Sequence, residues 1–305
     1  SNLQRARDAY SAADFGELLG EDGKIYCFPS MNMARTERNM QILWINIDWL
    51  KNLKLALPQT TEEFRRVLEA FRDGDPNGNG EADEIPLVSC EAEQALCSYR
   101  YLLNAFSYYD GTRLPGADGQ AEDRQGTAFR EGIAYCADLY EQGLLSGDCF
   151  SYTRRQLMEL VNDPADTVGA FASRSIADVI YTNNPDVLAH FVQLAPLSSD
   201  FEERGFAVRT DTVPTIGGLI PANAVHKEEA ARIMDTMLSG EASLIALYGE
   251  EDVDWRFSRD GELSGYGTRA KVTTIRYLKG EAQNQNYAGV GPLLATSDYA
   301  DGVTR

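Results

Sequence analysis

Hydrophobic residues recur every three or four positions in three stretches of the chain, which is the pattern of a helix with one buried face. One stretch begins at Thr60, which with Glu63 has the spacing of a capping box, and the others cover residues 127–142 and 226–238. The residues expected to face the core are Phe64, Val67, Leu68 and Phe71 in the first, Phe129, Ile133, Cys136 and Tyr140 in the second, and Ile233, Met234, Met237 and Leu238 in the third. The sequence therefore predicts three amphipathic helices.

Short apolar runs elsewhere predict buried strands. They cover residues 42–47, 168–172, 191–196 and 216–220. Strands of this kind combined with amphipathic helices are typical of an α/β fold. A chain of 305 residues is long for one hydrophobic core, so we expect two lobes.

The composition indicates a folded chain and argues against some partners. Hydrophobic residues make up 43% of the sequence and aromatic residues 10%, which is enough for a packed interior. With 28 basic against 47 acidic residues the net charge is -19, which argues against nucleic acid and anionic membrane surfaces. No apolar run is long enough to cross a membrane and the start is not a signal peptide, as expected of a mature or trimmed form.

The five cysteines include no Cys-x-x-Cys pair, and with only two histidines the chain has no zinc pattern. Cys90 and Cys97 are the pair near enough in sequence for a local disulfide. We expect buried, reduced thiols instead.

Oxygen-bearing side chains alternate along residues 75–84, in the spacing of a calcium loop of the EF-hand type. They belong to Asp75, Asn77, Asn79, Asp83 and Glu84, with Gly80 at the turn and the backbone carbonyl of Glu81 at the seventh place. An EF-hand has its bidentate carboxylate at the twelfth place, which here is Pro86, so Glu84 would have to take that role. The alternative is a solvated turn, but five oxygen side chains in register are more than a turn needs.

Several passages occur in the order and at the spacing found in one known family. They are residues 22–26 (DGKIY), 43–45 (LWI) with 48–50 (DWL), 57–64 (LPQTTEEF), 75–80 (DPNGNG) with 83–87 (DEIPL), 137–145 (ADLYEQGLL) and 248–255 (YGEEDVDW). On these passages the chain resembles the extracellular solute-binding proteins, family 1, of carbohydrate ABC transporters. The resemblance is to a Gram-positive lipoprotein subgroup related to the alginate-binding proteins, and it departs from the family at Asp252, where glycine is usual.

The resemblance implies an α/β fold of the two-lobed periplasmic-binding-protein type, with the first lobe incomplete in this chain. Lobe I would comprise residues 1–35 and 197–249, and lobe II residues 36–196 and 250–305 with the calcium loop. It implies an extracellular, monomeric receptor that binds an oligosaccharide in an interlobe cleft, delivers it to an ABC transporter permease and is held by a lipid anchor outside this chain. It also implies that the loop holds a structural calcium ion through Asp75, Asn77, Asn79, Asp83, Glu84 and the carbonyl of Glu81.

Sugars are held by aromatic platforms and planar polar side chains. The candidate ligand-binding residues are Trp44, Asn46, Tyr108, Tyr109, Arg174, Tyr181 and Trp255. Trp44 lies in an apolar run and also fits a core position, Arg174 could pair with an acid, and Tyr108 and Tyr109 fit either role.

Two other functions stay open. A pair of carboxylates could hydrolyse a glycoside, but no nucleophile motif, phosphate-binding glycine loop or His/Cys metal cluster accompanies the abundant acids, so an enzyme is disfavoured. A calcium-stabilised structural or adhesion module would keep the loop without the cleft.

Overall fold

The computed structural model describes residues 1–9, 16, 18–34, 41–111, 114–115, 121–122, 126–181, 185–208, 214–264, 268–275, 287–300 and 302. The chain forms two compact units. Unit 1 comprises Ser1–Arg38 with Thr210–Arg305, and unit 2 comprises Asn39–Arg209.

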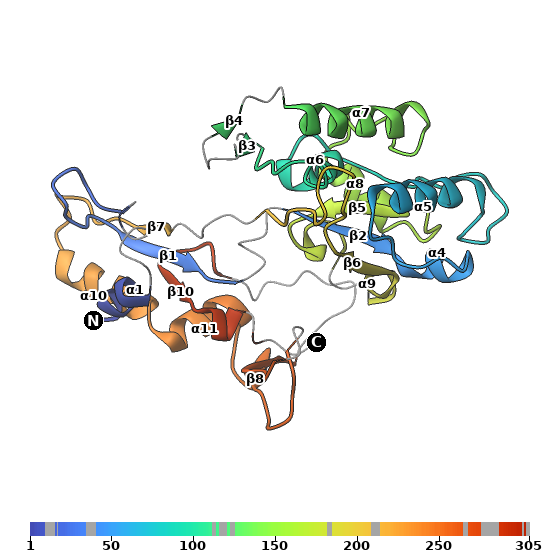
Figure 1. Cartoon of the computed structure of the whole chain (residues 1–305). Coiled ribbons are helices and arrows are strands. Elements are labelled where there is room, and N and C mark those ends of the chain that lie inside the picture. Colours follow the sequence, from blue (N-terminus) through green and yellow to red (C-terminus); the bar gives the residue numbers. More distant parts are fainter. Residues whose placement is uncertain are drawn as a thin grey trace. The chain divides into compact units, whose positions relative to one another are not determined.

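Unit 2 is built on a sheet in which β2 (Ile42–Asn46) lies between β5 (Ala170–Ser173) and β6 (Phe191–Leu194), as Figure 1 shows. Both neighbours run antiparallel to β2, so Ile42 pairs with Ser173 and Leu43 with Leu194 at the edge where β2 begins. The other elements of unit 2 are α4 (Ile47–Asn52), α5 (Thr61–Asp73), η1 (Gln94–Leu96), α6 (Ser98–Leu103), β3 (Leu114–Pro115), β4 (Ala121–Glu122), α7 (Thr127–Glu141), α8 (Arg154–Val161), η2 (Ile176–Asp178) and α9 (Pro185–His190).

The two faces of β2 enter different hydrophobic clusters. Leu43 and Ile45 are fully buried in the cluster that also holds the inward face of α5. Trp44 points to the other face, where it packs half-buried against a cluster around Phe171. The predicted α5 face is confirmed, since Phe64, Val67, Leu68 and Phe71 are buried and Thr60 caps the helix by accepting from the Glu63 N–H at 3.1 Å.

Unit 1 contains a sheet in which β1 (Phe28–Asn32) pairs parallel with β10 (Leu293–Ala295) and antiparallel with β7 (Thr215–Gly218). Its helices are α1 (Asn2–Ala9), α10 (Lys227–Met237), α11 (Gly240–Tyr248) and α12 (Ser297–Ala300). A hairpin of β8 (Trp255–Phe257) and β9 (Val272–Thr274) completes the described elements of this unit.

The boundaries of the units differ from the predicted lobes mainly in two segments. Residues 250–305, predicted with lobe II, belong to unit 1 because β10 is a strand of its sheet and Trp255 packs against Leu244 of α11. Residues 197–208, predicted with lobe I, belong to unit 2 because Leu197 is part of its core and the Thr61 N–H donates to the Ser198 carbonyl at 2.9 Å.

The predicted inward face of α10 is only partly right. Leu238, which follows the last residue of the helix, is fully buried, but Met234 and Met237 are only half-buried and Ile233 is 64% exposed. Polar contacts also hold this helix, since Asp235 accepts from the backbone N–H groups of Asn2 at 3.1 Å and Leu3 at 2.9 Å.

All five cysteines are buried free thiols, as the sequence predicts. Among the described helices none is both long enough and apolar enough to span a bilayer.

Candidate functional site

The segment that we call the Asp75 loop (residues 75–84) follows α5 directly. Asp75 has a left-handed φ of 46°, which turns its carboxylate back over the loop, where it accepts from the Gly80 N–H at 3.2 Å. Gly80 has a φ of 78°, a backbone conformation that favours glycine. The amide oxygen of Asn79 accepts from the Glu81 N–H at 2.7 Å. The loop is therefore closed by hydrogen bonds from its own side chains.

The C-terminal end of the Asp75 loop carries two adjacent acids, Asp83 and Glu84. Asp83 accepts from the amide nitrogen of Asn79 at 3.1 Å and from that of Asn77 at 3.3 Å. The Oε1 atom of Glu84 is buried and has no hydrogen-bond partner. Burial, together with the charges of Asp83 and Asp75, raises the pKa of the Glu84 carboxyl. An unpartnered buried carboxylate oxygen is costly, which makes this position suited to a cation.

The donor set of the loop fits calcium. Within the described part of the chain, no group of three or more His, Cys, Asp or Glu side chains stands ready to hold a metal ion. The carboxylates of Asp75, Asp83 and Glu84 therefore do not converge as such a group, and the amide nitrogens of Asn77 and Asn79 face Asp83. Carboxylate, amide and carbonyl oxygens are the ligands that calcium takes, and Glu84 supplies an oxygen that no protein donor satisfies.

The Asp75 loop is anchored to the end of β2 through Asp166. The amide nitrogen of Asn77 lies 3.5 Å from the Asp166 carbonyl, and the Asp166 carboxylate accepts from Asn46 at 3.1 Å and from the Trp49 indole at 3.0 Å. The Asn46 amide oxygen caps α4 by accepting from the Asp48 and Trp49 N–H groups. Asn46 is fully buried, so this predicted ligand-binding residue has a structural role instead.

The opposite end of the sheet, where β2 begins and β5 ends, carries a network of polar side chains that we call the Ser173 edge. The Trp44 indole N–H donates to the Ser173 hydroxyl at 2.9 Å, and that hydroxyl donates to the Ser175 carbonyl at 2.7 Å. The Ser175 N–H in turn donates to the Asp178 carboxylate at 2.9 Å, as part of a capping box at the start of η2. The chain enters unit 2 beside this edge.

Two arginines of the Ser173 edge are held by acids. The Arg154 guanidinium donates to the Asp178 carbonyl at 2.9 Å and to Glu93 at 3.3 Å, and it lies 3.7 Å from the Asp178 carboxylate. Arg174 lies 3.9 Å from the other oxygen of that carboxylate. The Asp178 side chain, 19% exposed, therefore lies within ion-pair distance of both cations.

The remaining predicted ligand-binding residues do not form one cluster. Tyr109 donates its hydroxyl to the Gly111 carbonyl at 3.0 Å, and its neighbour Tyr108 packs edge-on against Phe206 with ring centroids 5.8 Å apart. Tyr181 is 42% exposed. Trp255 lies in unit 1, is 2% exposed and donates its indole N–H to the Gly249 carbonyl at 3.0 Å, so its role is packing.

Sequence reasoning named Trp44 and Arg174, which the structure brings to one edge, but it missed Arg154, Glu93 and Asp178. A signal for Asp178 is present, because Ser175 and Asp178 have the spacing of a capping box. Glu93 and Arg154 are 61 residues apart, so their pairing follows from the tertiary fold.

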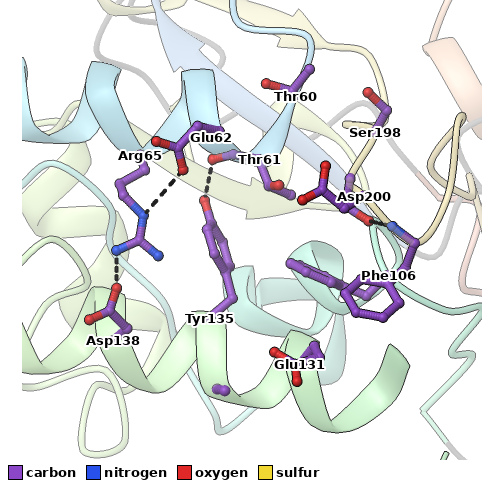
Figure 2. Close-up of a pocket in the computed structure, with 13 residues that line it drawn as sticks. Thr60, Thr61, Glu62, Arg65, Phe106, Glu131, Tyr135, Asp138, Ser198 and Asp200 are labelled. Carbon is purple, nitrogen blue, oxygen red and sulfur yellow. Dashed lines mark hydrogen bonds and ion pairs between the residues drawn. The ribbon is translucent and has the colours of Figure 1, made fainter. Parts of the chain in front are cut away.

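A groove of about 610 Å³ in unit 2 lies between the start of α5 and α7 (Figure 2). Figure 2 shows Arg65 reaching toward both Glu62 and Asp138, and the Tyr135 hydroxyl donating to the Thr61 carbonyl at 2.7 Å. None of the predicted ligand-binding residues lines this groove.

Comparison with known proteins agrees with the resemblance seen in the sequence. No protein-family model matches the chain. Over 145 residues, 44% of this chain, it is 36% identical to the fructooligosaccharide ABC transporter substrate-binding protein FusA of Streptococcus pneumoniae and covers 26% of that protein. Over 149 residues it is 28% identical to lipoprotein LipO of Bacillus subtilis and covers 28% of it. The chain thus matches about a quarter of the length of these relatives.

The solved structure of FusA in complex with kestose superposes on the whole of this chain with a TM-score of 0.73 at 23% identity, and the chain covers 62% of it. This chain has the solute-binding-protein fold. The predicted fold class and family resemblance are confirmed. An EF-hand mutant of FusA in complex with fructo-nystose shares this solute-binding-protein fold at a TM-score of 0.71 and 22% identity. The alginate-binding protein AlgQ2 without calcium ion does so at 0.58 and 21%, over 84% of this chain and 54% of AlgQ2.

Proposed function

We propose that this chain is part of the extracellular solute-binding receptor of an ABC importer and binds an oligosaccharide without chemical reaction. The observation that carries the proposal is the 36% identity to FusA, a substrate-binding protein of a fructooligosaccharide transporter. A binding protein also fits the Ser173 edge, where the polar groups are tied up in mutual hydrogen bonds and none is arranged as a nucleophile with its base.

The solute site includes the Ser173 edge. The residues proposed to contact solute are Trp44, Arg174, Tyr108, Tyr109 and Tyr181. Trp44 is only half-buried although its N–H is already bonded, so its ring can offer an apolar face to the C–H side of a sugar.

Titration calorimetry of the 305-residue chain with a panel of neutral and acidic oligosaccharides tests this function. Heat of binding without any change in the sugar, checked by chromatography of the recovered ligand, supports a receptor. Release of shorter sugars would identify a glycoside-active enzyme, and the absence of binding to every sugar would favour a structural or adhesion module.

We further propose that the Asp75 loop binds one structural calcium ion. The ligands are Asp75, Asn77, Asn79, the Glu81 carbonyl, Asp83 and Glu84. The ion would satisfy the buried Glu84 oxygen and join the end of α5 to the segment that contains Asp166. Calorimetric titration of calcium into chelator-treated protein, with magnesium as the control, measures this binding directly.

The partners and location follow from the receptor role. We propose a monomer that delivers its solute to the transporter permease and is attached to the outer face of the cell membrane by a lipid anchor in the full-length protein. LipO is a lipoprotein by name, which supports the anchor. Light scattering tests the monomer, which has a mass of 33.7 kDa for this chain.

A further inference from the structure

The charges of the Ser173 edge indicate which class of oligosaccharide it accepts. This inference rests on the proposed function. The two arginines of the edge, Arg154 and Arg174, are matched by Asp178, and Arg154 is also paired with Glu93. The edge therefore offers a ligand no excess of positive charge.

The Asp178 carboxylate is held by the backbone N–H of Ser175. Asp178 is the third residue of the Ser175 capping box, and its Oδ2 atom accepts from the Ser175 N–H at 2.9 Å. Its carboxylate thus stays close to both guanidinium groups without ordering a long side chain. A carboxylate on a sugar would have to compete with it for the same donors.

Two glutamine side chains bind backbone carbonyls beside the start of β2. Asp110 accepts through its carbonyl from Gln94 at 2.9 Å, and the Gln94 carbonyl accepts from Gln41 at 2.7 Å, just before β2. Burial and the charge of Asp110 raise the pKa of the neighbouring Tyr108 hydroxyl. The carboxylates that pair with the two arginines of the edge are those of Asp178 and Glu93.

We infer that the Ser173 edge selects uncharged oligosaccharides and rejects uronates, with Asp178 as the residue that sets this selectivity. Recognition of a carboxylate needs a guanidinium or ammonium whose donors are available, and like charges placed together oppose binding. A neutral sugar needs only the aromatic face of Trp44 and hydroxyl contacts, neither of which Asp178 blocks.

The test compares neutral oligosaccharides with oligoalginate and oligogalacturonate of equal length by calorimetry at low salt. We expect the unaltered chain to bind a neutral sugar at least about tenfold more tightly than any uronate of that length. Asp178→Asn keeps an oxygen to accept from Ser175 but removes the charge. We expect it to raise uronate affinity about tenfold and to change neutral-sugar affinity less than about threefold.

Glu159→Gln is the matched control, because it removes the same charge from an exposed pair with Arg155 on α8, at 2.8 Å, and should change neither affinity. Uronate binding as tight as neutral binding in the unaltered chain would overturn the inference, whether or not the Asp178 variant folds. A folded Asp178→Asn protein that gains no uronate affinity would also overturn it. If no sugar of either class binds, the receptor function itself is wrong.

Discussion

The two ends of β2 carry opposite kinds of polar chemistry. At the Asn46 end, the Asp75 loop gathers acids and leaves the buried Glu84 Oε1 without a donor. At the Ile42 end, the Ser173 edge pairs each of its arginines with an acid and bonds the Trp44 indole to Ser173. At the Asp75 loop a cation would therefore neutralise unpaired negative charge. At the Ser173 edge the charges are already paired, which suits an uncharged ligand.

Removing calcium should have the largest effect in this comparison. An ion that binds the folded state alone stabilises it by about 2.7 kcal/mol when it is present at about 100 times its Kd. For a unit of this size we expect chelation to lower Tm by about 5–10 °C, measured by calorimetry. The affinity for sugar should fall only indirectly, since the proposed calcium site and the Ser173 edge lie at opposite ends of β2. An unchanged Tm after chelation would mean that the Asp75 loop does not bind a stabilising calcium ion.

The next effect in size is that of Glu84→Gln. Its raised pKa means that the folded, calcium-free protein disfavours the ionised Glu84, so a neutral amide should leave the calcium-free Tm no lower than that of the unaltered protein. The rise in Tm on adding calcium should disappear, because the charged ligand is lost. Thermal scans with and without calcium measure both.

Glu81→Gln provides the matched control for Glu84. Position 81 is proposed to supply only its backbone carbonyl, so this variant should keep the full calcium response. If Glu81→Gln abolished that response and Glu84→Gln preserved it, the proposed ligand assignment would be wrong.

A smaller effect is expected at the other end of the strand. Replacing Trp44 with leucine keeps a hydrophobic residue on this face of β2 but removes the aromatic ring. Aromatic contacts contribute about 0.5–1.5 kcal/mol, so we expect neutral-sugar affinity to fall by about twofold to twelvefold in calorimetric titration. The rise in Tm with calcium should be unchanged. A variant that lost both properties would show that the two ends of β2 are not independent.

The sequence alone predicts several parts of unit 2 whose signals are local, although in α7 the predicted core residues Ile133 and Tyr140 are 44% and 40% exposed. The spacing of Phe64, Val67, Leu68 and Phe71 defines the buried face of α5, and the alternating oxygens after it define the Asp75 loop. The cap of α4 is likewise local, since the Asn46 amide oxygen accepts from the Asp48 and Trp49 N–H groups. Local hydrogen bonding therefore explains most of what was predicted correctly.

What the sequence could not predict depends on tertiary contacts. The pairing of Glu93 with Arg154 joins residues 61 positions apart, and β10 joins β1 from the other end of unit 1. The helical spacing in α10 suggested a buried face, but spacing does not show whether a neighbour covers it, and Ile233 is 64% exposed. The pairing of distant charges and the order of the strands can therefore be assigned only once the fold is known.

The smallest expected effect concerns Glu262 in unit 1, a carboxylate whose charge is fully hydrogen-bonded. It serves as a reference for the unpartnered carboxylate of Glu84. Glu262 accepts from Arg256 at 2.6 Å, from the Arg259 N–H at 2.7 Å and from Thr273 at 2.9 Å, and these hydrogen bonds lower its pKa to about 2. A lowered carboxyl pKa contributes stability at neutral pH that is lost as pH falls from the ordinary value of 4.5 toward 2.

Glu262→Gln should therefore lower Tm by about 2 °C at pH 7, and the difference from the unaltered protein should vanish as the pH falls through this window. Because the pair lies in unit 1, the decrease at pH 7 should be the same with calcium and with chelator. A Tm decrease that appeared only in chelator would show that calcium at the Asp75 loop also stabilises unit 1. The effect of the loop would then not be confined to one end of β2.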